Sequence, residues 1–117
     1  YEVRRKISMT VKEIADRLRL KAVCAEENTE REVTGCYIGD LLSLVMSRAP
    51  ADCAWVTVMG NVNTAAVALL ADVACIIVAE SCAVDTDMLE KVREKEIAVF
   101  KTELPVFEAA CAVQKLI

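Results

Sequence analysis

The 117-residue sequence contains no histidine. A serine or cysteine nucleophile would therefore lack its usual base, and nucleophilic catalysis is poorly supported. Neither a GxxxxGK[ST] loop nor a GxGxxG run occurs, so the common phosphoryl-transfer and dinucleotide-binding motifs are missing as well. We expect a chain that is not an enzyme and carries no cofactor.

Close cysteine pairs are also missing, although the chain has six cysteines. Zinc and iron–sulfur sites normally draw on C-x-x-C pairs, so we expect no metal. Most of the cysteines lie in apolar runs such as VACIIVA, where cysteine behaves as a small hydrophobic residue, and we expect reduced thiols. Cys82 alone is expected in a loop, just before a helix, where a thiol pKa can fall. A catalytic Cys82 is the enzymatic alternative.

Aromatic residues make up only 4% of the chain, whereas 56% of its residues are hydrophobic, so valine, alanine, leucine and isoleucine must build the core. The net charge of −4 argues against nucleic-acid binding, which needs clustered basic side chains. The longest apolar run, 65–79, has Asp72 in its middle and is shorter than the ~20 residues of a membrane span. No signal peptide heads the chain, and we expect a cytoplasmic protein without a membrane segment.

Strands and helices are expected to alternate along most of the chain. Thr10 and Glu13 form a capping box that predicts a helix, and residues 1–8 read as an N-terminal extension. Asp40 is expected to cap the helix 41–48. The other helices are predicted at 63–72, 86–95 and 105–116, and the strands at 21–25, 33–38, 53–59, 75–79 and 97–101. This order predicts a single α/β domain over 9–117, with a mainly parallel sheet flanked by helices and built from repeated βα units.

The predicted helix around 65–71 (AAVALLA) is apolar on every side, which is typical of a helix buried all round. Two explanations stay open. The helix pairs with a second copy of the chain, with Val67 and Leu70 as interface candidates, or the N-terminal helix covers it.

Polar loops are expected at the carboxyl ends of the parallel strands, where open α/β sheets bind their ligands. These loops are 39–40, 60–64, 80–85 and 101–103. They supply most of the ligand-binding candidates, namely Gly39, Asp40, Gly60, Asn61, Asn63, Thr64 and Cys82. The alternative is plain helix capping, above all for Asn63 and Asp85.

The stretch TEREVTGCYIGDLLSLVM resembles the signature of the DRTGG domain, an Asp-Arg…Thr-Gly-Gly pattern that leads into Tyr-x-Gly-Asp-Leu. Here the pattern reads Glu30-Arg31, Thr34-Gly35-Cys36 and then 37–41 (YIGDL). WVTVMGNVNTAAVALLADVACIIVAE and PVFEAACAV are similar to later parts of the family, so the likeness covers nearly all of 9–117. Glu30 and Cys36 depart from the pattern, and Cys36 removes a close backbone approach there.

This resemblance implies an α/β domain that occurs alone or attached to CBS-containing pyrophosphatases and phosphotransacetylases, with a relative at the N-terminus of HPr kinase/phosphatase. In those proteins the chemistry belongs to the neighbouring domain, so the resemblance implies a regulatory or assembly role, often with dimer contacts. Thr34 and Gly35 join the ligand-binding candidates, and Arg31 and Tyr37 join the interface candidates. The alternative is that these residues only shape a strand-to-helix corner.

The sequence thus predicts a non-enzymatic regulatory or protein-interaction module that acts as a homodimer. The alternative is a sensor that binds a nucleotide or another small anion at the strand-end loops.

Overall fold

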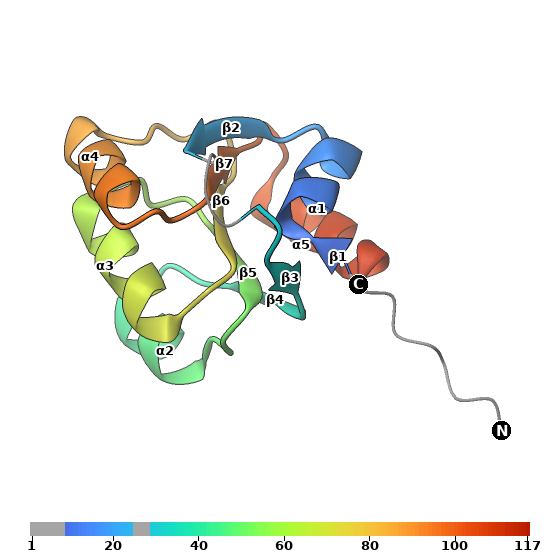
Figure 1. Cartoon of the computed structure of the whole chain (residues 1–117), viewed down its shortest axis with the longest axis horizontal. Coiled ribbons are helices and arrows are strands. Elements are labelled where there is room, and N and C mark those ends of the chain that lie inside the picture. Colours follow the sequence, from blue (N-terminus) through green and yellow to red (C-terminus); the bar gives the residue numbers. More distant parts are fainter. Residues whose placement is uncertain (1–8, 25–28) are drawn as a thin grey trace, which may run out of the picture.

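The computed structural model describes residues 9–24 and 29–117 (Figure 1). The predicted extension 1–8 and the residues 25–28 lie outside the described part of the chain, so the end of the predicted strand 21–25 is not tested. Within the described part, the structure is a single α/β unit.

A five-stranded sheet forms the centre of the molecule, with strand order β2-β7-β6-β5-β4. The three ladders among β4, β5, β6 and β7 are parallel, and β2 joins the edge of the sheet antiparallel to β7. The strands are β2 (Lys21–Cys24), β4 (Gly35–Ile38), β5 (Cys53–Thr57), β6 (Cys75–Val78) and β7 (Val99–Lys101). β1 (Met9–Thr10) pairs separately with β3 (Glu32–Val33). The mainly parallel sheet predicted from the sequence is confirmed.

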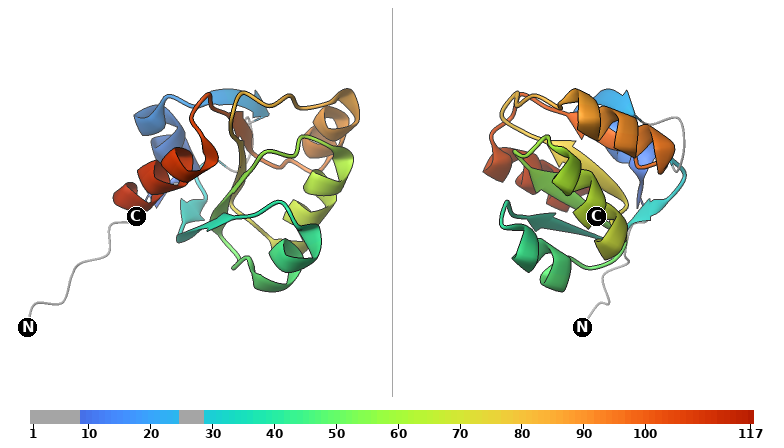
Figure 2. Two further views of the ribbon diagram at one scale, coloured as in Figure 1. Left: turned by 180° about the vertical axis from the view of Figure 1, so that it is seen from behind. Right: turned by 90° about the vertical axis from the view of Figure 1, so that its left-hand side faces the viewer.

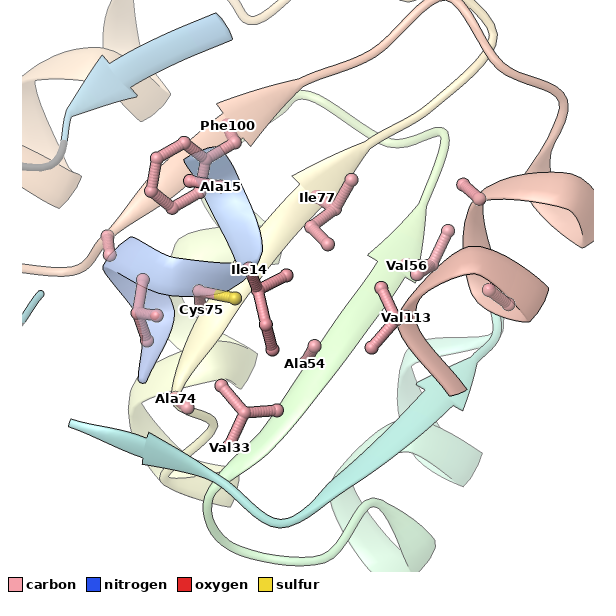
Figure 3. Packing of buried hydrophobic residues seen from close by; sticks show 14 of the residues in the cluster. Ile14, Ala15, Val33, Ala54, Val56, Ala74, Cys75, Ile77, Phe100 and Val113 are labelled. Atoms are coloured by element: carbon pink, nitrogen blue, oxygen red, sulfur yellow. The ribbon is translucent and has the colours of Figure 1, made fainter. Parts of the chain in front are cut away.

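Helices cover both faces of this sheet (Figures 1 and 2). α1 (Val11–Leu18) and α5 (Val106–Leu116) lie on one face, and α2 (Leu42–Arg48), α3 (Val62–Ala71) and α4 (Thr86–Glu94) lie on the other. Each of the two helical layers packs against the sheet and buries an apolar core. Ile14, Val56, Ile77 and Val113 meet on the first face (Figure 3), and Trp55, Ile76, Met88 and Val92 are buried on the second.

The capping box predicted for the first helix is present. Thr10 Oγ1 accepts a hydrogen bond from Glu13 N at 3.1 Å, and Glu13 Oε1 accepts one from Thr10 N at 3.1 Å. α1 then ends at Arg19, whose φ of 54° lies in the left-handed region. Val11, Ile14 and Ala15 form the buried face. The capping box thus predicted the start of this helix.

Asp40 does not cap α2, contrary to the prediction. The N-cap of α2 is Leu41, which makes no side-chain capping bond. Asp40 Oδ1 instead accepts hydrogen bonds from the hydroxyl of Thr57 and from Val58 N, which draw the carboxylate toward the end of β5. The carboxylate therefore ties the end of β4 to the end of β5.

The position of α3 also corrects a prediction. α3 packs against α2 and α4, and α1 lies on the opposite face of the sheet, so the N-terminal helix cannot cover it. Val67 is buried at 5% exposure and offers almost no surface to a partner, because it points into the core. Leu70 is 70% exposed. The uniformly apolar helix is therefore buried on one side and open to solvent on the other.

None of the described helices is both long enough and apolar enough to cross a membrane.

Candidate functional site

The four polar loops predicted to meet do come together at the carboxyl edge of the sheet. Asp40 contacts Thr57 and Val58, as described above. Asp85 N donates to Gly60 O at 2.8 Å, and Ser81 N donates to Thr102 O at 3.1 Å. Hydrogen bonds therefore link the 39–40 loop to the end of β5, the 60–64 loop to the 80–85 loop, and the 80–85 loop to the 101–103 loop.

Gly60 packs against protein rather than against open space. A Cβ atom at this position would lie 1.9 Å from Ala83 O and 2.9 Å from Val84 Cα. Its φ is not positive, so the backbone conformation itself does not demand glycine. The absence of a side chain lets the 60–64 loop lie directly on the 80–85 loop.

Capping accounts for much of the 60–64 loop, but the capping residue differs from the prediction. Asn61, and not Asn63 or Thr64, is the N-cap of α3, because its Oδ1 accepts hydrogen bonds from Asn63 N at 2.9 Å and Thr64 N at 3.3 Å. Thr64 is buried, and its hydroxyl donates to Met59 O at 3.0 Å. Among these three residues, Asn63 is the one whose side chain is exposed.

The 80–85 loop uses its two carboxylates as caps. Asp85 Oδ1 accepts a hydrogen bond from Met88 N at 2.9 Å and so caps α4, in line with the capping alternative. Glu80 Oε2 accepts one from Val106 N at 2.9 Å, at the start of α5. Glu80 and Ser81 both have left-handed backbones, with φ of 60° and 56°. Cys82 is half-buried and packs against the second core.

A cavity of about 450 Å³ opens beside these loops, where β7 leads into α5 and β2 begins. Its volume falls within the range of small-molecule sites. Its lining includes three cationic residues, Arg19, Lys21 and Lys101, and one acidic residue, Glu103. Ser81, Thr102, Leu104 and Pro105 complete the lining. The loop 101–103 had been expected at this edge, but Arg19 and Lys21 had not.

The signature stretch is split between the two ends of β4. Gly35 pairs with Cys53 where both strands begin, whereas Gly39 and Asp40 follow the end of β4. Thr34 and Gly35 therefore lie at the amino edge of the sheet, away from the other ligand-binding candidates. Tyr37, between them, is half-buried and packs against the second core.

Arg31 forms an intramolecular network at this amino edge. Its Nε lies 2.8 Å from Asp52 Oδ1, and its Nη2 lies 3.0 Å from Asp72 Oδ1 and 2.7 Å from Asp72 O. Asp52 and Asp72 have left-handed φ values of 66° and 58°. Although burial alone would lower the pKa of Arg31, its hydrogen bonds to the two carboxylates raise it. Arg31 thus holds two turns of its own chain, a role the sequence did not predict.

Burial strongly raises the pKa of three of the six thiols. Burial raises the pKa of Cys53 and of Cys75 to about 12 and that of Cys36 to about 11, so these thiols stay protonated at neutral pH. All six cysteines are free. Over residues 9–24 and 29–117, no group of three or more cysteine and acidic side chains is placed to hold a metal ion.

Comparison with known proteins identifies the fold. No protein-family model matches the sequence, and no curated protein matches it. One solved structure similar to this chain contains the CBS and DRTGG domains of the regulatory region of a Clostridium perfringens pyrophosphatase, complexed with its activator diadenosine tetraphosphate. The TM-score is 0.71 at 15% sequence identity, over 89% of this chain and 45% of that one. This chain thus spans less than half of the structure it matches. At this identity the likeness is one of fold, and it supports the resemblance that the signature stretch predicted: the chain has a DRTGG-like α/β fold.

Proposed function

We propose that this chain is a regulatory module without catalytic activity of its own, and that it acts as a homodimer through the outer face of α2 and α3. The observation that carries the proposal is the exposed apolar surface on these two adjacent helices. The exposed apolar residues of these two helices, together with the N-cap of α2, define what we call the α2–α3 face: Leu41, Leu44, Met46, Val62, Leu69 and Leu70.

The composition of α3 favours a second copy of the chain as the partner. α3 (VNTAAVALLA) has no charged residue, yet Val62, Leu69 and Leu70 are 39%, 48% and 70% exposed. Large exposed apolar surface is typical of interaction sites. Each copy carries a net charge of −4, so two copies meet at the lowest electrostatic cost through a face that bears little charge.

The similar structure supports the regulatory part of the proposal, because it is itself the regulatory region of a larger enzyme. The sequence contains no histidine, the usual base for a serine or cysteine nucleophile. A module of this kind acts by changing its association with a partner or with itself.

Leu70→Asp tests the dimer. The substitution places a charge in the centre of the proposed interface, and we expect the dissociation constant of the dimer to rise at least ~100-fold, which corresponds to about 2.7 kcal/mol. Sedimentation velocity over a concentration series measures it. Because Leu70 is 70% exposed, the monomer should remain folded.

Phe107→Asp is the matched control. Phe107 is 71% exposed, as Leu70 is, but lies on α5 at the opposite face of the sheet. This variant should dimerise like the parent chain. A parent chain that sediments as a monomer at high micromolar concentration would contradict the proposal, as would a dimer that Phe107→Asp disrupts and Leu70→Asp spares.

A small-ligand sensor is the second candidate. It is favoured by the cavity of about 450 Å³ at the carboxyl edge of the sheet, where α/β folds bind ligands. Thermal unfolding of the reduced protein against a panel of nucleotides and metabolic anions tests it. A ligand at 100 times its dissociation constant adds about 2.7 kcal/mol, which should raise the midpoint by roughly 10 °C. A panel without any shift removes this candidate and leaves the homodimer proposal untouched.

A further inference from the structure

We propose that the cavity lined by Arg19, Lys21 and Lys101 binds a phosphorylated small molecule, with the three cationic side chains holding the phosphate. The inference rests on the ligand-sensor candidate above and names the class of ligand for its cavity, which lies at the edge between β2 and β7. It is independent of the dimer.

The strand register brings the charges together. Lys21 and Lys101 are direct partners in the antiparallel β2–β7 ladder. Side chains opposite each other in such a ladder extend from the same face of the sheet, and like charges there destabilise the pairing. Arg19 adds a third positive charge at the same wall. The fold thus tolerates a repulsive arrangement that a bound anion would relieve.

The three cationic side chains exceed the acidic ones at this cavity. Arg19, Lys21 and Lys101 form no salt bridge in the described part of the chain, although acidic residues outnumber basic ones 18 to 14 in the whole sequence. With Glu103 as the one carboxylate, the lining carries three positive charges and one negative charge, a net of +2. An acidic protein that gathers unpaired cations around a cavity is suited to a doubly charged anion.

The other residues that line the cavity indicate which chemical groups the ligand carries besides the phosphate charge. The Thr102 hydroxyl oxygen accepts a hydrogen bond from Leu104 N at 3.2 Å, which leaves its hydrogen available for a phosphate oxygen. Ser81 also lines the cavity. Leu104 and Pro105 form an apolar side. The cavity, about 450 Å³, exceeds what one phosphate group fills, so a phosphate joined to a ring or an alkyl portion fits it better than inorganic phosphate alone.

Calorimetric titration with AMP, inorganic phosphate and adenosine tests the inference. We expect AMP to bind, phosphate to bind more weakly and adenosine not to bind. AMP affinity should fall as salt is raised, since the contact is electrostatic. Lys21→Gln and Lys101→Gln should each weaken AMP binding about tenfold, as expected for loss of one charged hydrogen bond. Lys115→Gln removes the same charge from the far end of α5 and should change binding less than about twofold.

Lys21→Glu separates binding from folding. It replaces a repulsive cross-strand pair by an attractive one, so the unfolding midpoint should stay unchanged or rise by ~1–4 °C while AMP binding is lost. The inference is overturned if AMP and phosphate fail to bind at millimolar concentration. It is also overturned if AMP binds and none of the Lys21 and Lys101 variants weakens it, in which case the sensor candidate stands at another site.

Discussion

Gly60→Ala should lower the free energy of unfolding by about 3 kcal/mol or more, the upper range for a group forced into packed protein. The added Cβ would lie 1.9 Å from Ala83 O and 2.8 Å from the carbonyl carbon of the same residue. Both atoms belong to backbone, which cannot rotate away as a flexible side chain would. Urea unfolding followed by the fluorescence of Trp55, the one tryptophan in the sequence, measures the loss.

Gly35→Ala is the control for this substitution. No heavy atom lies within 4 Å of a Cβ built at Gly35, and its φ is not positive. An alanine in this strand should be neutral or stabilise the fold by up to ~1 kcal/mol, because it restricts the unfolded chain. Equal losses in the two variants would mean that the loop contact at Gly60 is not what makes glycine necessary there.

The expected effect of Gly60→Ala also bears on the search for a ligand. Gly60 was predicted as a place where a ligand approaches the backbone, but the atoms that approach it belong to Ala83 and Val84. A Gly60 variant that lost a ligand response would therefore report a displaced loop. The lysine variants at the β2–β7 edge do not have this weakness, because Lys21 is exposed and Lys101 only half-buried.

Local patterns predicted the order and type of the elements well. The capping box of Thr10 and Glu13 lies at the start of α1 as expected, and Asp85 caps α4. Such caps can be predicted from sequence because the two residues that form them are only three positions apart. The near-continuous apolar runs predicted strands buried on both faces, and β5 and β6 are buried throughout. Asp40 was misassigned because a threonine on another strand competes for its carboxylate.

The site was harder to predict, because residues far apart in the sequence build it. Lys21 meets Lys101 through the β2–β7 register, and an antiparallel edge strand in an otherwise parallel sheet leaves no local signal. Arg31 likewise meets Asp52 and Asp72 through the fold. A motif read as one cluster can also be divided by a strand, as β4 separates Gly35 from Gly39.

Trp55→Ala should lower the free energy of unfolding by about 3–5 kcal/mol, because a large ring is removed from a closed core and leaves a cavity. Trp55 is fully buried on β5, among Val45, Ala65 and other residues of the second core. Circular dichroism in urea measures the loss, since the variant has no tryptophan to report on folding.

Trp55→Phe separates the ring from its hydrogen bond. Trp55 Nε1 donates to Gly39 O at 2.9 Å, and phenylalanine keeps most of the apolar volume but leaves that carbonyl without its donor. We expect a smaller loss, about 1–3 kcal/mol. If both variants lost the same amount, the hydrogen bond and not the packing would dominate. Because Gly39 precedes α2, a Phe variant that also weakened self-association would link this buried contact to the α2–α3 face, through the turn that sets the start of α2.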